Sequence, residues 1–186
     1  MIDDKEKWDL RHKENPPIKT PLKLLEDFIS LANPNKALDI ACGMGRNSLF
    51  MRDCGFCVES VDISSYALDS LQNQPNITPI LADVDCFKIP PNQYNLICNS
   101  YFLEWRLFPF ILKGLKKGGI LVFETFALSD DENLNAFAKD SSHLLYKNEL
   151  LRAFLDLEIL FYEEKIIERT RSPLSKALVA SLVAKA

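Results

Sequence analysis

Hydrophobic residues along this chain follow two alternating patterns. Short continuous apolar runs, typical of strands buried on both faces of a sheet, recur between residues 37 and 126. The segments between them carry apolar residues at the three- and four-residue spacing of amphipathic helices. The predicted strands are 37–41, 57–63, 77–82, 94–99 and 120–126, and the predicted helices are 21–32, 46–54, a short one from Tyr66, 103–115 and 142–157.

Two further β-like runs close the chain, at 158–167 and 177–183. The segment between them is short and has no helical pattern, so these two strands should pair antiparallel. The alternation of strands and helices before them predicts a doubly wound α/β fold. We therefore expect a Rossmann-like, three-layer αβα arrangement whose seven-stranded sheet is mostly parallel, with one antiparallel C-terminal strand.

Composition fits one domain over residues 1–186, because hydrophobic residues make up 47% and charged residues 26% of the chain. A Pro-containing stretch after the charged N-terminus sets apart residues 1–35, which we expect to be a helical segment able to act as a lid. Residues 36–186 then form the Rossmann-like core. We leave open whether the protein is a monomer or a homodimer.

Charge and apolar content limit the partners. The net charge of −4 makes nucleic acid an unlikely partner, because such binding needs a basic surface. No apolar run approaches the roughly 18 residues of a membrane-spanning helix, and the charged N-terminus lacks a signal peptide's apolar stretch. The expectation is a cytoplasmic protein that does not associate with membranes. The five cysteines, an odd number, do not indicate a disulfide framework.

The segment Asp39-Ile40-Ala41-Cys42-Gly43-Met44-Gly45 follows the first strand and carries the main chemical signal. Glycines in a strand-to-helix turn let the backbone approach a ligand closely, and the next helix points free N–H groups at the same place. Asp62 ends the second strand and can accept hydrogen bonds from both ribose hydroxyls. Asp83 ends the third strand and can accept from an adenine amino group. Their order at the ends of consecutive strands predicts a nucleoside site.

These motifs resemble those of the class I S-adenosylmethionine-dependent methyltransferases. The pattern Asp/Glu-x-Gly-x-Gly-x-Gly is present as Asp39, Ala41, Gly43 and Gly45, and alanine at the first glycine position should cost little if its φ is negative. A closer likeness, to the small tellurite-resistance-like methyltransferases, is carried by Trp8-Asp9-Leu10-Arg11-His12 and by the extension of the glycine turn to Arg46-Asn47.

The resemblance implies S-adenosyl-L-methionine as the cofactor. It places the methionine part on the glycine turn, the ribose on the acid of the second strand, the adenine on the loop after the third strand, and an amide on the methyl side. The implied cofactor-binding residues are Asp39, Ala41, Gly43, Gly45, Asn47, Asp62, Ile63, Asp83, Val84 and Asn99.

Two other functions remain open. A nicotinamide-dinucleotide oxidoreductase is the first, because the glycine turn nearly reads Gly-x-Gly-x-x-Gly with Asp62 as the distal acid. Ser48 in place of the third small residue and the charge of Asp39 near a pyrophosphate count against it. The second is a domain that binds S-adenosylmethionine without catalysis.

The catalytic residues are not identified by the sequence. His143 can serve as a general base or simply begin a helix, and Tyr101 can line a substrate pocket or belong to the core. Glu104 lies among aromatic residues, where an acid needs a partner. Trp8 and Arg11 can close over the cofactor, or Trp8 can anchor the segment to the core.

No metal site is expected, because the only Cys-x-x-Cys pair falls where a helix ends and both histidines are distant in sequence. Methyl transfer by in-line displacement at the sulfonium carbon needs mainly alignment and exclusion of water. The scarcity of convincing bases favours a soft or already anionic acceptor, and the short loops favour a small molecule.

Overall fold

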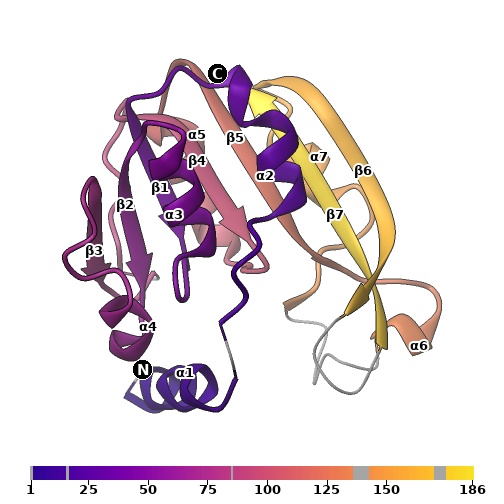
Figure 1. The fold of residues 1–186 in the computed structure, drawn as a ribbon. Helices are drawn as coiled ribbons and strands as arrows, with labels where there is room; N and C mark the ends of the chain where they lie inside the picture. Colours follow the sequence, from indigo (N-terminus) through magenta and orange to yellow (C-terminus); the bar gives the residue numbers. More distant parts are fainter. Residues whose placement is uncertain (1, 16, 85, 136–142, 170–174) are drawn as a thin grey trace.

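A seven-stranded mixed sheet forms the centre of the computed structural model, which describes all residues except 1, 16, 85, 136–142 and 170–174. The strand order is β3-β2-β1-β4-β5-β7-β6 (Figure 1). Neighbouring strands from β3 to β5 are parallel, and β7 runs antiparallel to both β5 and β6. The predicted sheet with one antiparallel strand is confirmed. The strands are β1 Lys36–Ile40, β2 Cys57–Asp62, β3 Ile77–Leu81, β4 Tyr94–Ser100, β5 Leu115–Ala127, β6 Glu158–Arg169 and β7 Ser175–Lys185.

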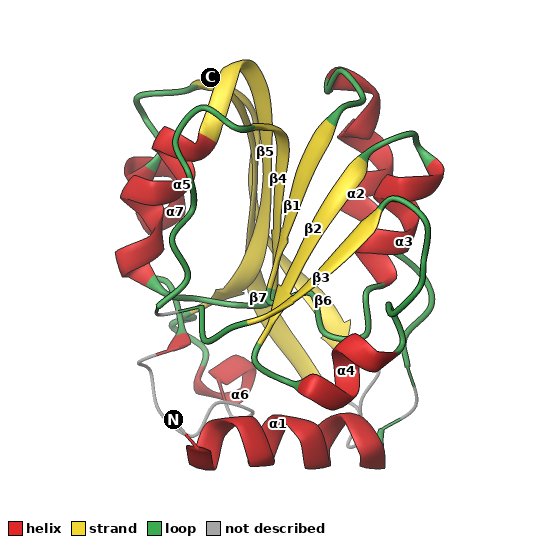
Figure 2. Ribbon diagram, turned by 90° about the vertical axis from the view of Figure 1, so that its left-hand side faces the viewer, coloured by secondary structure: helices red, strands yellow, loops and turns green. Residues whose placement is uncertain are grey.

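Helices cover both faces of the sheet, as Figure 2 shows. One face carries α2 (Lys23–Phe28) and α3 (Arg46–Asp53), with the 3-10 turn η1 (Ile29–Leu31) continuing α2. The other face carries α5 (Phe108–Gly114), preceded by η2 (Trp105–Leu107), and α7 (Glu149–Ala153). Three elements lie at the carboxyl end of the parallel strands, namely α1 (Ile2–Glu14), α4 (Ser65–Asp69) and α6 (Glu132–Asn135).

The core lies in two layers, because successive residues of a strand point to opposite faces. Leu38 of β1 and Ile97 of β4 belong to the cluster under α5 and α7, whereas Ala37 and Leu96 belong to the cluster under α2 and α3. All four side chains are fully buried. Burial on both faces explains why the sequence shows continuous apolar runs rather than alternation.

The predicted helix 142–157 is wrong over most of its described length. Among its described residues only Glu149–Ala153 is α-helical, and the preceding Asn148 adopts a left-handed φ of 58°. Leu145 is instead extended against the end of β5, where its N–H donates to the Phe126 carbonyl at 3.0 Å and its carbonyl accepts from Leu128 N–H at 2.8 Å. The apolar spacing therefore reflects burial of an extended segment. Residue 142 lies outside the described residues.

The other boundaries shift less. The predicted helix 103–115 begins later, because Glu104 caps the 3-10 turn and Pro109 occupies the first turn of α5. The strand predicted from residue 120 begins at Leu115. In the described part of the chain, no helix is both long and apolar enough to cross a membrane.

Candidate active site at the carboxyl end of the sheet

The glycine turn joins β1 to α3 in a left-handed backbone conformation. Gly43 has a φ of 55° and Gly45 a φ of 79°. A Cβ on Gly45 would lie 2.4 Å from Leu71 Cδ2, and one on Gly43 would lie 3.3 Å from His12 Cε1. Glycine is therefore required at Gly45 both by its φ and by its close approach to a buried side chain.

Ala41 does not have the negative φ under which alanine was expected to cost little. Its φ is +51°, not negative. An L-residue in this region costs about 1–2 kcal/mol, because its Cβ approaches the following carbonyl. The alanine in place of the first glycine of the motif is therefore a strained substitution. Such strain is typical of functional sites, where the surrounding structure holds the backbone in place.

Asp62 links the glycine turn to β2. One carboxylate oxygen accepts from Gly43 N–H at 2.7 Å, and the other accepts from Ser64 N–H at 2.8 Å. The side chain is only 6% exposed. Each carboxylate oxygen can accept a second hydrogen bond, so a pair of ligand hydroxyls fits the remaining capacity of this group.

Asp39 lies beneath the turn and is fully buried. Its Oδ2 accepts from Ser48 Oγ at 2.5 Å, and Ser48 Oγ in turn accepts from Ser60 Oγ at 2.8 Å. Its Oδ1 is buried and has no hydrogen-bond partner among the described residues. Burial raises the pKa of this carboxyl to about 7, against the opposing effects of the Ser48 hydrogen bond and the Arg46 charge. A buried acceptor of this kind suits a cationic ligand group.

The adenine-side candidates follow β3, next to Asp62. Ala82 N–H donates to the Asp62 carbonyl at 3.0 Å, which holds the start of the loop that carries Asp83 and Val84 beside β2. Asp83 is partly exposed, and Val84 is buried. Ile63, directly after Asp62, is also partly exposed. The loop and the glycine turn therefore lie at the same end of the parallel strands, on either side of β2.

The two asparagines predicted to bind the cofactor form hydrogen bonds to other residues of the protein. Asn99 is buried and donates to the Phe102 carbonyl at 2.8 Å. Asn47 accepts from Leu22 N–H at 2.9 Å and donates to Ser100 Oγ at 3.0 Å. Both residues lie at the site, and the contacts seen here brace the loop after β4 and the segment before α2.

The three candidate catalytic residues have different surroundings. Tyr101 follows β4 and donates its hydroxyl to Glu124 Oε1 at 2.8 Å. Glu104 accepts from Arg106 Nε at 2.8 Å and from Arg106 N–H at 3.0 Å, so a neighbouring arginine is its partner. His143 is exposed, two residues before the bridge of Leu145 to β5. Of the three, Tyr101 is the candidate whose hydrogen bond joins it to a buried carboxylate.

Glu124 is not among the residues that the sequence predicts for the site. It lies on β5, is 4% exposed, and its Oε2 accepts from Ser181 Oγ at 2.7 Å. The available signal was a single acid within an apolar strand run, because a buried charge requires partners or a function.

Helix α1 lies against the site, and the Trp8 ring predicted to act there is 5.9 Å from the His12 ring. The Arg11 guanidinium lies 4.8 Å from the Trp8 ring centroid, so these two side chains contact each other. Asp9 accepts from Ser64 Oγ at 2.6 Å and from Tyr66 N–H at 3.1 Å, at the start of α4. The Ser64 hydrogen bond lowers the Asp9 pKa. Together with His12 against Gly43, these contacts hold α1 over the turn.

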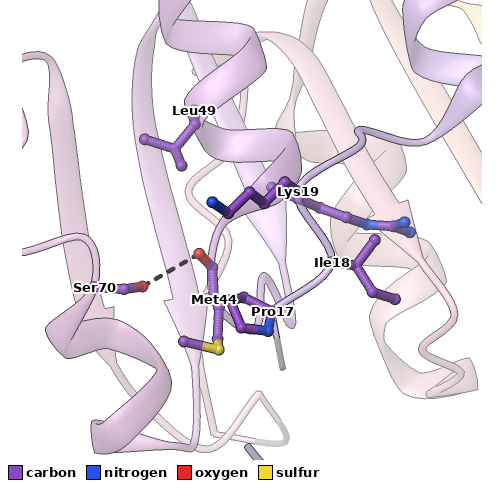
Figure 3. A pocket seen from close by; sticks show the side chains of 7 residues that line it. Pro17, Ile18, Lys19, Met44, Leu49 and Ser70 are labelled. Carbon is purple, nitrogen blue, oxygen red and sulfur yellow. Dashed lines mark hydrogen bonds between the residues drawn. The ribbon is translucent and has the colours of Figure 1, made fainter. Parts of the chain in front are cut away.

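A pocket of about 290 Å³ lies beside the turn (Figure 3). Met44 of the turn, Leu49 of α3 and the segment Pro17 to Lys19 line it. Ser70 Oγ donates to the Met44 carbonyl at 3.2 Å at its edge. In the described residues, no group of three or more His, Cys, Asp or Glu side chains is arranged to hold a metal ion.

The sequence profile of the methyltransferase domain family matches residues 10–175. The chain belongs to this family. The methyltransferase class predicted from the glycine turn and the two aspartates is thereby confirmed.

Individual relatives of this methyltransferase-family chain agree. TehB of Haemophilus influenzae, named a probable S-adenosyl-L-methionine-dependent methyltransferase, is 29% identical over 154 residues, which are 76% of this chain and 52% of TehB. The crystal structure of TehB superposes with a TM-score of 0.75 at 23% identity, covering 87% of this chain and 60% of that one. This bears out the tellurite-resistance-like resemblance. The chain spans about half the length of TehB.

Other solved structures share the fold. A SAM-dependent methyltransferase of Methanosarcina mazei has a TM-score of 0.69 at 18% identity, covering 89% of this chain and 98% of that chain. The [4+2]-cyclase SpnF has a TM-score of 0.66 at 15% identity, covering 87% of this chain and 77% of that chain. Because the same fold carries a cyclase, the fold alone does not determine the reaction.

Proposed function

We propose that this chain transfers a methyl group from S-adenosylmethionine to a small-molecule acceptor. The proposal rests on one observation: three groups that can accept or donate hydrogen bonds lie together at the ends of adjacent strands. These are the Oδ1 of Asp39, which has no partner among the described residues, the backbone of Gly43 to Gly45, and the carboxylate of Asp62. The family match supports the reaction class.

Each set fits one part of the cofactor. The buried Asp39 carboxylate suits the ammonium of the methionine part, and the turn lets the backbone approach it. Asp62 has the capacity to accept both ribose hydroxyls. Asp83 and Val84 follow the next strand and would hold the adenine. The residues present therefore fit the cofactor.

When bound, S-adenosylmethionine supplies an activated methyl group on a sulfonium. The protein then has to align the acceptor for in-line displacement and exclude water. Helix α1 is proposed to serve as the lid, because Asp9 and His12 place it against α4 and the glycine turn. A lid held so close to the turn favours a small acceptor over a macromolecule.

Calorimetric titration of the full chain with S-adenosylmethionine and with NAD tests the cofactor. We expect binding of the first only. Asp62→Asn should weaken it by about 1–3 kcal/mol, since hydrogen bonds to charged groups contribute that much. Asp69→Asn, at an exposed aspartate of α4, is the matched control and should leave binding unchanged. Tighter binding of NAD, or equal effects of the two variants, would overturn the assignment.

Radiolabelled methyl transfer to a panel of thiols and metalloid oxyanions then tests the reaction. Transfer to at least one small acceptor is expected. Binding of the cofactor without transfer to any acceptor would instead favour the non-catalytic alternative.

A further inference from the structure

Tyr101 has a strained backbone conformation and forms two hydrogen bonds to Glu124, while its ring packs 5.1 Å from the Phe126 ring centroid. Its φ is +56°, which is unusual for a bulky residue and costs about 1–2 kcal/mol. Its N–H donates to the Glu124 carbonyl at 2.7 Å, and its hydroxyl donates to the Glu124 carboxylate at 2.8 Å. Two hydrogen bonds to one residue thus fix both the backbone and the ring of Tyr101.

Glu124 is an unusual partner because its buried carboxylate is hydrogen-bonded by neutral donors. Tyr101 and Ser181 donate one hydrogen bond to each oxygen. Among the described residues, no nitrogen of Lys, Arg or His lies within 4.0 Å of this carboxylate. A buried charge without a directly paired counter-charge is costly, so a further cation bound nearby would relieve part of that cost.

The pair lies beside the glycine turn. Tyr101 follows Ser100, which Asn47 of α3 holds by a hydrogen bond of 3.0 Å. The Arg46 guanidinium, directly after Gly45, lies 5.7 Å from the Tyr101 ring centroid. Tyr101 therefore lies between the end of β4 and the turn that the proposed function assigns to the methionine part of the cofactor.

We infer that Tyr101 faces the sulfonium side of the bound methyl donor and that Glu124 is the residue that positions it. This inference rests on the proposed function. The negative charge of Glu124, conveyed through the Tyr101 hydroxyl, favours the positively charged sulfonium of S-adenosylmethionine. The product, S-adenosylhomocysteine, is a neutral thioether and gains nothing from this charge. The pair thereby makes the site prefer the donor over the product and assists product release.

Burial and the charge of Glu124 raise the pKa of Tyr101 well above its ordinary value. The phenol accordingly stays protonated and donates to Glu124. Its oxygen keeps lone pairs for a polarised methyl group.

A purely structural role is the competing explanation, and the chain offers a matched control for it. Tyr162 on β6 also donates its hydroxyl to a glutamate, Glu164, at 2.6 Å. This second pair lies on the outer strand of the sheet, away from β1 to β4. It has the same hydroxyl-to-carboxylate hydrogen bond without proximity to the glycine turn, although Glu164 also accepts from Asn148 N–H.

The test is calorimetric titration of the full chain with S-adenosylmethionine and, separately, with S-adenosylhomocysteine. Glu124→Gln should weaken binding of the donor at least fivefold and change binding of the product less than twofold. Tyr101→Phe should shift the ratio of the two dissociation constants in the same direction, by about twofold or more. Tyr162→Phe should leave both constants unchanged.

Equal weakening of donor and product would overturn the inference, since it indicates a structural role. An unchanged ratio in Tyr101→Phe would also overturn it, and this variant decides the matter if Glu124→Gln does not fold. If the unaltered chain binds neither compound, the proposed function itself fails, which is a distinguishable result.

Discussion

Replacing Asp39 with asparagine should change how the stability of this protein depends on pH. Asp39 is fully buried, and its pKa is raised from 3.8 to about 7, chiefly by burial. The folded state therefore binds one more proton than the unfolded state between about pH 4 and pH 7. The contribution of Asp39 to the free energy of unfolding is greatest near pH 4, is lost as the pH rises toward 7 and is constant above pH 7.

The size of the effect follows from the pKa difference. An interval of about three pH units corresponds to a loss of about 4 kcal/mol in the free energy of unfolding between pH 4 and pH 8. An asparagine side chain would keep the shape and an acceptor for Ser48 without an ionisable group. The stability of Asp39→Asn relative to the unaltered protein should therefore rise by about 2–3 kcal/mol from pH 5 to pH 8.

Urea unfolding at pH 5, 6, 7 and 8 measures this difference. The other titrating groups are common to both proteins, so the difference between the two curves isolates Asp39. The variant should also bind S-adenosylmethionine more weakly, because the carboxylate proposed for the ammonium is gone. Parallel pH profiles of the two proteins would refute the reasoning.

Two further predictions concern the turn and the lid. In thermal unfolding, Gly45→Ala should destabilise the fold by about 2–5 kcal/mol, from left-handed strain plus overpacking against Leu71. Gly118→Ala is the control, because Gly118 has nearly the same φ of 78° and a Cβ there would meet nothing within 4 Å. It should cost only about 1–2 kcal/mol. Equal losses would show that the Leu71 contact is unimportant. Asp9→Ala should speed hydrogen exchange of the α1 amides at least fivefold, because the hydrogen bonds to Ser64 and Tyr66 are lost. Glu6→Ala, at an exposed position of the same helix, is the control, and protection of α1 that survives in Asp9→Ala would exclude the proposed attachment.

The sequence predicted most of the sheet and the main cofactor motif, because these depend on local patterns. Strands buried on both faces produce continuous apolar runs, and the glycine turn and Asp62 directly follow such runs. Since parallel strands end at one edge of a sheet, their order along the chain was sufficient to predict a common site.

The helix predicted at 142–157 shows where local patterns fail. Leu145 is buried, but it bridges to the end of β5 instead of forming a helical turn. The spacing of apolar residues alone does not distinguish a helix from this extended segment, because β5 competes for the backbone hydrogen bonds that a helix would form internally. Alanine at position 41 was expected to cost little on condition that its φ is negative, and the turn imposes a positive φ that the sequence does not reveal.

By itself, the sequence determined the class of fold, the glycine turn and the two aspartates that end neighbouring strands. Only the tertiary structure decided which partners these groups have. The Tyr101–Glu124 hydrogen bond joins residues 23 apart, and the Asp9–Ser64 bond joins residues 55 apart. Such pairs form only when packing of the whole sheet brings distant segments together. The burial of Asp39 is likewise a property of the assembled core. It leaves Oδ1 without a partner among the described residues and raises the pKa of the carboxyl.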